Sequence, residues 1–335
     1  MQKSAKNKRA TLRDVARYAK VSVATVSRVL NDSALVSQAT RERVEDTIEV
    51  LGFVPSAAAR TLNSGNSRTI GALVPTLDHS IFARYLDALE NQLSKQGYAL
   101  IVSVTGGVPS VEERKAFGLL DLGVEGLVVS GCTHSTRFDA LVDRFRVPVL
   151  ITSYFDTEAR YPTIGYDNRA IATKALRYLR SLGHQSVSVI HGATDVNDRI
   201  LARIEAIREA AVDVTVKFWP VSMDVPGGAD AVREMAKQKD WSSALLCLSD
   251  VQALGALFEL QRQGVLVPRD ISIMGFDDLE WSAVSAPGIT SISLPAREMG
   301  THAANALVAW IRTGERAQPM SIGAEIVVRG STREV

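Results

Sequence analysis

The chain has 335 residues, of which 46% are hydrophobic and 22% charged, and this composition excludes a disordered, collagen-like or disulfide-stapled protein. At roughly 100–200 residues per domain, the length predicts two or three domains. The net charge of +1 conceals an asymmetry, because residues 1–68 hold 12 of the 38 Lys and Arg residues but 6 of the 37 Asp and Glu residues. The basic amino-terminal segment therefore indicates a polyanionic partner, nucleic acid first and an anionic membrane surface second, with a solvated charged face as the alternative.

Three short helical patterns open the chain. The first two run over about residues 12–19 and 23–31, and a third precedes Gly52. Capping residues predict the starts of the helices, at Thr11 with Asp14, at Ser22 and at Ser37. Because about three residues separate the first two helices, the pattern is typical of a helix-turn-helix, with any three-helix bundle as the alternative.

The second helix carries side chains that suit a DNA-reading helix. Its first turns hold Val23, Ala24, Thr25, Ser27 and Arg28. Short side chains let a helix end press into a major groove, and an arginine supplies a bidentate donor for base edges. This chemistry favours the helix-turn-helix over a plain bundle.

Residues 56–68 form the connection to the rest of the chain. An alanine-rich stretch with helix propensity leads into a Ser, Gly and Asn linker, and the stretch is too short to be a stable helix alone. A segment that can change between coil and helix is suited to act as an order–disorder switch. The sequence therefore predicts a DNA-binding domain over 1–55, a short helix and linker over 56–68, and a ligand-binding domain over 69–335.

From residue 69 the chain alternates apolar runs with helical patterns, which predicts α/β layers with parallel sheets. The runs expected as buried strands lie at 70–74, 99–104, 127–130, 147–152, 187–191, 214–218, 244–248 and 271–276. Helical patterns lie at about 82–96, 112–121, 136–145, 168–182, 198–210, 228–238, 250–263 and 297–313. We expect two doubly wound halves, one over about 69–161 plus 293–320 and the other over about 162–290 plus 321–335.

Polar and aromatic residues follow the predicted strands. Ligands of open α/β sheets bind outside the carboxyl ends of the strands, and hydroxyls, carboxylates and aromatic rings suit a polyhydroxylated small molecule. The candidate contacts are Asp78, Phe82, Tyr154, Met223, Ser249, Asp250 and Asp277, with Arg203 reaching the same cleft from the following helix. The alternatives are a helix cap for Asp250, a turn for Asp277 and a core position for Phe82.

Other classes of function find no support in the sequence. Nucleotide-binding, zinc-protease and serine-hydrolase motifs are absent, so we expect a non-enzyme without a cofactor. The five histidines form no i, i+4 pair, and Cys132 and Cys247 lie in apolar runs, so we expect free thiols and no metal site. The polar first residues and the lack of a run of about 18 apolar residues predict a cytoplasmic protein with no membrane partner.

Several stretches, taken together and in this order, resemble the LacI/GalR family of bacterial transcription repressors. They include Thr11-Leu-Arg-Asp-Val-Ala-Arg-Tyr-Ala, Val21-Ser-Val-Ala-Thr-Val-Ser-Arg-Val-Leu-Asn31, Leu51-Gly-Phe-Val-Pro55 and Val267-Pro-Arg-Asp-Ile-Ser-Ile-Met-Gly-Phe-Asp277. The resemblance extends over essentially the whole chain. It implies a homodimer that places two helix-turn-helix domains on the double-stranded DNA of an inverted-repeat operator.

The resemblance also assigns DNA contacts. It implies that Val23, Ala24 and Arg28 face base edges, and that phosphates are held by Thr11, Ser22, Thr25, Ser27, Asn31 and Thr40. Ala59 and Leu62 would belong to a hinge helix in the minor groove, where an apolar wedge kinks the duplex. Lys20 occupies the turn, where the family usually has a residue that tolerates positive φ.

For the rest of the chain, the resemblance implies a fold like that of periplasmic sugar-binding proteins, with a small-molecule effector, a sugar or sugar acid, bound between the two halves. The effector would act as an inducer or, as in the purine-type branch, as a co-repressor. A solute-binding protein with the same fold is the alternative, which the basic amino-terminal segment opposes. The sequence thus predicts a DNA-binding transcription regulator, a repressor associated with the nucleoid.

Overall fold

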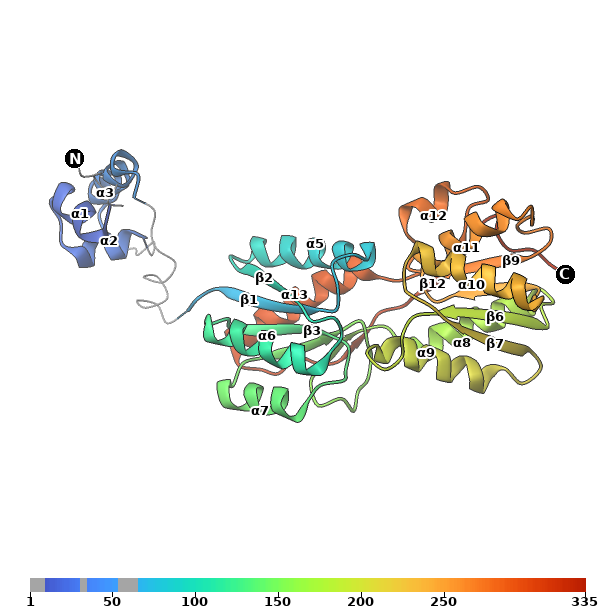
Figure 1. Ribbon diagram of the computed structural model, residues 1–335. Helices are drawn as coiled ribbons and strands as arrows, with labels where there is room; N and C mark the ends of the chain where they lie inside the picture. Colours follow the sequence, from blue (N-terminus) through green and yellow to red (C-terminus); the bar gives the residue numbers. More distant parts are fainter. Residues whose placement is uncertain (1–9, 31–34, 54–65) are drawn as a thin grey trace, which may run out of the picture. The chain divides into compact units, whose positions relative to one another are not determined.

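The structure is a computed structural model that describes residues 10–30, 35–53 and 66–335 (Figure 1). The predicted DNA contacts Asn31, Ala59 and Leu62 lie outside these residues. The chain divides into two compact units, here called the head, which ends at Ser67, and the body, which begins at Arg68.

Three helices form the head; side-chain caps at Thr11 and Ser22 begin the first two, whereas Ser37 precedes the third without a capping hydrogen bond to the main chain. They are α1 (Leu12–Tyr18), α2 (Val23–Leu30) and α3 (Gln38–Leu51). The Asp14 N–H donates to Thr11 Oγ1 (3.3 Å) and the Thr11 N–H donates to Asp14 Oδ2 (3.0 Å), which completes a capping box. Apolar residues at helical spacing form the core of the head: Val15, Ala16, Ala19, Val26, Val29, Val44 and Phe53.

The turn between α1 and α2 contains a strained residue. Lys20 has a φ of 54°, in the left-handed region that costs a residue with a Cβ roughly 1–2 kcal/mol. The family resemblance places Lys20 where a residue that tolerates positive φ is usual, and Lys20 adopts that conformation. A glycine supplies the same conformation at the end of α3, where Gly52 has a φ of 56°.

The body contains two six-stranded sheets, which define its two lobes. The first lobe has the strand order β11-β5-β4-β3-β1-β2 and the second has the order β12-β10-β9-β8-β6-β7. The strands of the first lobe are β1 (Thr69–Val74), β2 (Ala99–Val104), β3 (Gly126–Ser130), β4 (Val149–Thr152), β5 (Thr163–Gly165) and β11 (Met320–Ser321). Those of the second are β6 (Ser186–His191), β7 (Thr215–Pro220), β8 (Ala244–Cys247), β9 (Ser272–Phe276), β10 (Thr290–Ser293) and β12 (Glu325–Val327). Among the described residues, neighbouring strands pair in parallel, except that β10 and β12 are antiparallel.

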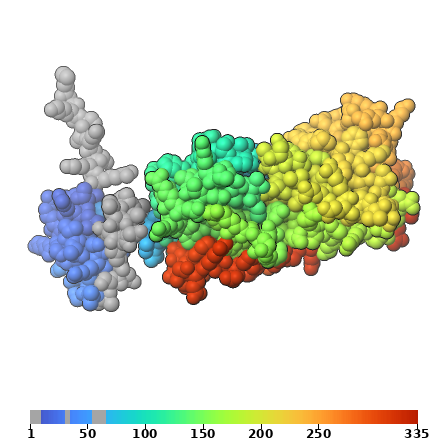
Figure 2. Space-filling model, turned by 90° about the horizontal axis from the view of Figure 1, so that it is seen from below, coloured from blue at the N-terminus to red at the C-terminus, as the bar shows by residue number. Residues whose placement is uncertain are grey.

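Helices cover both faces of each sheet, as expected for a doubly wound fold (Figure 1). In the first lobe α5 (Ser80–Lys95) packs with α13 (Ala296–Thr313), and α6 (Pro109–Asp121) packs with α7 (Thr136–Phe145). The second lobe pairs α8 (Asn168–Ser181) with α9 (Asp198–Ala210) and α10 (Val225–Gln238) with α11 (Asp250–Arg262), and also holds the short α12 (Glu280–Val284). In Figure 2 the red carboxyl-terminal part of the chain lies against both lobes, which agrees with its strands entering both sheets.

The limits of the two lobes differ from those expected at residues 161 and 293. Strand β5 pairs with β4, so the chain leaves the first lobe after Gly165. Ser293 still pairs with Glu325 in the second lobe, and Ser321 pairs with Gly165 in the first. Strands β5, β10, β11 and β12 have two to four residues each, too few to show a hydrophobic period, so the sequence did not reveal them.

Candidate functional site

The head exposes one face of α2. Val23, Ala24 and Arg28 point outward while Val26 and Val29 fill the core, because a helix of 3.6 residues per turn separates these two sets. Val23 is 44% exposed, which is high for a large apolar side chain in a small domain. The exposed set is the one that the sequence predicts to face base edges.

The hydroxyls predicted to hold phosphates lie at helix starts. Thr11 precedes α1, Ser22 precedes α2, and Thr40 lies in the first turn of α3. Ser22 Oγ accepts from the Thr25 N–H (3.0 Å), and Thr40 Oγ1 lies 2.9 Å from the Ser37 hydroxyl. Helix amino termini carry partial positive charge and free N–H groups, so this placement suits contact with phosphate. Ser27 is half-buried on the following turn of α2.

The body contains a cavity of about 90 Å³ at the carboxyl ends of strands from both sheets. Residues after β1, β4 and β5 line it from the first lobe, and residues after β8, β9 and β10 line it from the second. The lining residues are Pro75, Thr76, His79, Ile81, Phe82, Tyr85, Ser153, Tyr166, Asn197, Arg199, Ile200, Arg203, Met223, Leu248, Ser249, Asp277, Leu294, Ala296 and Met299. An apolar wall with a few convergent polar groups is typical of a small-molecule site.

Of the eight predicted ligand contacts, the structure brings five together around this cavity: Phe82, Arg203, Met223, Ser249 and Asp277. Asp78 is exposed and does not line the cavity, and Tyr154 packs against the core of the first lobe. Asp250 has no exposed surface and accepts hydrogen bonds within the second lobe. It begins α11 directly after Ser249, the N-cap of that helix.

Arg199 is the lining residue of most consequence that the sequence interpretation missed. It lies four residues before Arg203 on α9, so both guanidinium groups share one face of that helix. Arg199 is 7% exposed, and its Nη1 donates to Asp198 Oδ1 (3.1 Å). The i, i+4 spacing of the two arginines was the signal that would have found it.

Asp277 lies at the end of β9 in an unusual backbone conformation. Its φ of 104° directs the carboxylate into the cavity, where Oδ2 accepts from Ser249 Oγ (3.0 Å). Burial raises the pKa of Asp277 to about 6, while the charge of Arg203, the hydrogen bond from Ser249 and the Asp250 N–H oppose that rise. A partly desolvated carboxylate at this position suits the hydroxyls of a ligand.

Asp198 connects the two lobes beside the cavity. From the start of α9 in the second lobe, its Oδ2 accepts from the main-chain N–H groups of Cys132 (2.5 Å) and Thr133 (3.0 Å) in the first. Gly131, with a φ of 95°, permits this approach, because an added Cβ would lie 2.3 Å from the Arg199 guanidinium. Burial, with the charge of Asp198, raises the pKa of Cys132 to about 12, so the thiol stays protonated.

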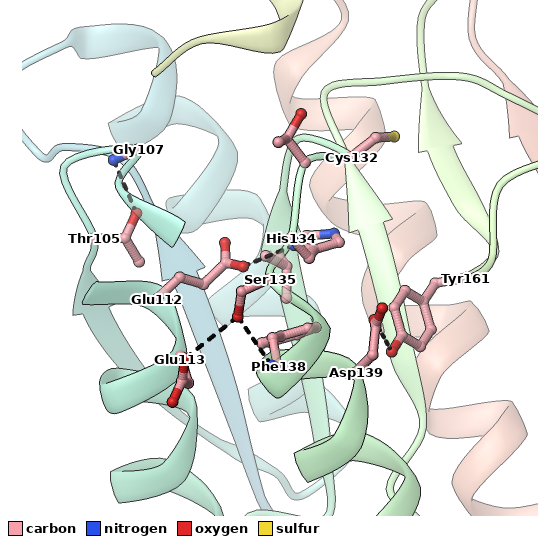
Figure 3. A network of polar contacts seen from close by, with 12 residues as sticks. Thr105, Gly107, Glu112, Glu113, Cys132, His134, Ser135, Phe138, Asp139 and Tyr161 are labelled. Carbon is pink, nitrogen blue, oxygen red and sulfur yellow. Dashed lines mark hydrogen bonds and ion pairs between the residues drawn. The ribbon is translucent and has the colours of Figure 1, made fainter. Parts of the chain in front are cut away.

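A separate polar network fixes the segment that follows β3 (Figure 3). His134 Nδ1 lies 2.7 Å from Glu112 Oε1, and Ser135 Oγ accepts from the Phe138 N–H (3.1 Å) at the start of α7. These residues do not line the cavity. His134 directly follows Cys132 and Thr133, whose main-chain N–H groups donate to Asp198.

A second connection between the lobes joins α5 to the segment after β9. Arg84 Nη1 donates to the Asp278 carbonyl oxygen (2.8 Å), and Arg84 Nη2 lies 3.9 Å from Glu280 Oε1. The two lobes therefore meet through Arg84 as well as through Asp198. Both connections involve segments next to the cavity lining.

The described part of the chain holds no group of three or more His, Cys, Asp or Glu residues placed to bind a metal ion. No helix within the described ranges has the length and apolar character required to cross a bilayer.

Comparison with known proteins identifies the family. Residues 11–56 match the model for bacterial regulatory proteins of the lacI family, and residues 176–332 match a periplasmic binding protein-like domain. The chain is 30% identical over 337 residues to the HTH-type transcriptional repressor CytR of Escherichia coli, an alignment that covers 97% of this chain and 96% of the relative. It is 33% identical over 313 residues to the ribose operon repressor of Haemophilus influenzae, covering 90% and 92%. The chain therefore belongs to the lacI family of bacterial regulatory proteins.

A solved structure agrees on the fold. The lac repressor dimer bound to operator and the anti-inducer ONPF superposes with a TM-score of 0.88 at 24% identity, covering 97% of this chain and 100% of that one. The predicted fold class, a helix-turn-helix domain followed by two parallel-sheet subdomains, is confirmed. The relatives are transcriptional repressors, so the predicted class of function, a DNA-binding transcription regulator, is confirmed as well.

Proposed function

We propose that a small polyhydroxylated molecule binds in the body cavity and thereby controls the affinity of the head for an operator. The observation that carries this proposal is the cavity itself, which both lobes line with carboxylate, guanidinium, hydroxyl and aromatic groups. A related protein is a ribose operon repressor, which supports a carbohydrate effector for this chain.

The DNA contacts follow from the exposed face of α2. Val23, Ala24 and Arg28 contact base edges, and Arg28 supplies most of the hydrogen-bond readout because the other two offer only apolar contact. Phosphates are bound by the hydroxyl residues Thr11, Ser22, Thr25, Ser27 and Thr40, and by Asn31. Ala59 and Leu62 contact the minor groove from the segment that joins the head to the body.

Two copies of the chain bind together. A single recognition helix reads a few base pairs, so sufficient specificity requires two heads on an inverted repeat, with half-sites spaced by whole turns of the duplex. We therefore propose a homodimer as the DNA-binding form.

The body has a direct route for coupling ligand to DNA. Strand β1 begins at Thr69, next to the connection with the head, and Pro75 and Thr76 follow its end at the cavity. A ligand that contacts both lobes favours one relative arrangement of them, and the coupling requires differential affinity on the order of 1–3 kcal/mol.

The test begins with an operator selected from random duplex DNA by the full-length protein. Fluorescence anisotropy then measures the affinity for that operator with and without sugars, sugar acids and nucleobases, each first screened by thermal shift. We expect an inverted repeat and at least one compound that changes operator affinity about 5-fold or more. A compound that weakens binding is an inducer, and one that strengthens it is a co-repressor. Ligand binding without any sequence-specific DNA binding would instead support a solute-binding protein.

A further inference from the structure

A second cavity lies within the first lobe, and we call it the arginine pocket. Its volume is about 460 Å³, whereas the cavity that both lobes line, here called the effector cavity, has about 90 Å³. The residues that line the arginine pocket are Val142, Asp143, Arg146, Val147, Val149, Arg160, Tyr161, Trp310 and Arg316. Of the described residues, none lines both cavities, so a molecule in the arginine pocket occupies a separate site.

Three neighbouring strands bring the arginines of this pocket together. Arg146 lies three residues before β4, Arg160 three residues before β5, and Arg316 four residues before β11. These strands are adjacent and parallel in the first sheet, so the residues that precede them meet at one edge of it. The effector cavity lies at the other edge, where the strands end. The fold therefore places the two cavities at opposite edges of the same sheet.

The arginine pocket carries more positive than negative charge. Arg160 is paired, because its Nη2 donates to both carboxylate oxygens of Asp143 (2.8 Å each). Arg316 Nη2 donates to a neutral acceptor, the Arg160 carbonyl oxygen (2.5 Å), and the Arg146 side chain makes no hydrogen bond or ion pair within the described residues. Three guanidinium groups thus share the pocket with one carboxylate, and this excess of charge favours an anionic ligand.

An apolar surface accompanies these charges. Trp310 packs against the core of the first lobe from the last turn of α13, and it is half-buried where it lines the pocket. Val147 is also half-buried, whereas Val142, Val149 and Tyr161 are buried. A flat ring stacks favourably on an indole and on guanidinium planes. The pocket therefore suits a ligand that has a planar apolar part as well as a charge.

We propose that the arginine pocket binds a small aromatic oxyanion, a planar ring that carries a carboxylate or a phosphate. The oxyanion is held by Arg146 and Arg316, whose guanidinium groups supply forks of parallel N–H donors. The ring lies on the apolar surface at Trp310. The volume of the pocket falls within the roughly 300–1,000 Å³ of small-molecule sites. This inference goes beyond the proposed function and does not rest on it.

A purely structural role explains Arg160 but not the other two arginines. Arg160 Nε donates to the Tyr161 hydroxyl (3.2 Å), and that hydroxyl donates to Asp139 Oδ1 (2.7 Å; Figure 3). Arg160 therefore joins α7 to the segment before β5. Arg316 makes one hydrogen bond to the main chain, and within the described residues the side chain of Arg146 makes none. One exposed arginine needs no partner because water solvates it, but two at the same apolar pocket give that pocket an affinity for anions.

The first test measures binding to the unmodified full-length protein. Isothermal titration calorimetry gives the Kd of naphthoate and of adenosine monophosphate, each compared with its uncharged counterpart, naphthamide or adenosine. Acetate and inorganic phosphate are the anions without a ring. We expect naphthoate or the nucleotide to bind about 10-fold or more tightly than both its uncharged counterpart and the bare anion, because exposed ion pairs contribute modestly and two act together.

The outcomes of this comparison are distinct. The tighter of naphthoate and adenosine monophosphate identifies carboxylate or phosphate as the oxyanion. An uncharged counterpart that binds as tightly as the charged compound overturns the role of the arginines. A bare anion that binds as tightly overturns the role of the ring. A lack of binding by both charged compounds overturns the inference as a whole.

The second test locates the site. The double substitution Arg146→Asn and Arg316→Met should reduce the affinity for the charged compound about 10-fold and leave that for the uncharged one unchanged. Asparagine suits position 146, because Arg146 has a φ of 54° and asparagine tolerates that conformation. Arg144→Met is the matched control, because Arg144 lies on α7 beside the ring of Phe145 (6.0 Å) and does not line the pocket. Undiminished affinity in the double variant, or an equal loss in the control, overturns the inference.

Tryptophan fluorescence gives a second measurement that needs no change to the arginines, in case the double variant does not fold. Naphthoate bound on Trp310 should quench the emission of the unmodified protein, and Trp310→Phe should lose most of that quenching. Trp241→Phe is the control, because Trp241 is exposed and lines neither cavity. Quenching that persists in Trp310→Phe, or that Trp241→Phe removes to the same extent, places the ligand elsewhere and overturns the inference.

Discussion

We expect Asp250 to make the stability of the body depend on pH. This carboxylate has no exposed surface and accepts hydrogen bonds from the Leu279 N–H (2.8 Å), Ser282 Oγ (2.6 Å) and Ser291 Oγ (2.7 Å). Burial, with a smaller contribution from the charge of Asp277, raises the pKa of Asp250 to about 7 against these hydrogen bonds. The perturbation we consider is Asp250→Asn, which keeps the shape of the side chain and removes its titration.

Proton binding to Asp250 decides whether the free energy of unfolding rises or falls with pH. Between about pH 4 and pH 7 the folded protein holds a proton on Asp250 that the unfolded chain has lost, so the free energy of unfolding falls as the pH rises through this window. A shift from 3.8 to about 7, at 1.36 kcal/mol for each pKa unit, gives an upper limit of about 4 kcal/mol. The difference in stability between the protein and Asp250→Asn should change by that order across the window.

Urea unfolding from pH 4 to 7.5 provides the assay. The four tryptophans, Trp219, Trp241, Trp281 and Trp310, all lie in the body, so their fluorescence reports the unfolding of that unit. Asp213→Asn is the control, because that exposed carboxylate pairs with Arg180 at the surface. Identical pH slopes for the protein and Asp250→Asn would refute the reasoning. A smaller slope up to about pH 6 should remain in the variant, because burial also raises the pKa of Asp277.

Three further substitutions test the head and the cavity. Arg28→Ala should cost roughly 1–3 kcal/mol of operator affinity in anisotropy at fixed salt, and an unchanged affinity would exclude Arg28 from base readout. Asp277→Ala should remove the response to effector while operator binding persists, and an undiminished response would exclude Asp277 from the ligand site. Lys20→Gly should stabilise the head by up to about 1 kcal/mol, seen as slower amide hydrogen exchange in α1 and α2, because glycine relieves the strain at positive φ. Exchange as fast as in the unmodified head would show that Lys20 is not strained.

The sequence was sufficient to predict the head and the layers of the body. The caps at Thr11 and Ser22 are visible in the sequence because each cap hydrogen bond joins residues only three apart in the chain. Continuous apolar runs such as that of β9 identify buried parallel strands, because helices cover both faces of such a strand. The short β5 lacks any such local signal, because its place depends on β4 and β11 on either side.

The ligand site was predictable as a region but not residue by residue. Asp250 and Asp277 both follow strands of the second sheet, and the sequence treats them alike. Three donors from α12 and β10 surround Asp250, whereas the positive φ of Asp277 turns its carboxylate into the cavity. Such distinctions depend on contacts between segments remote in the chain.

The contact between Asp198 and the first lobe has a consequence for genetic screens. Its two closest donors are main-chain N–H groups, which every residue except proline possesses, so most substitutions of Cys132 or Thr133 leave them in place. Asp198 itself offers no such tolerance, and Gly131 has no room for a side chain. Random mutagenesis should therefore recover altered lobe contacts at Asp198 and Gly131 far more often than at the two residues that complete the contact.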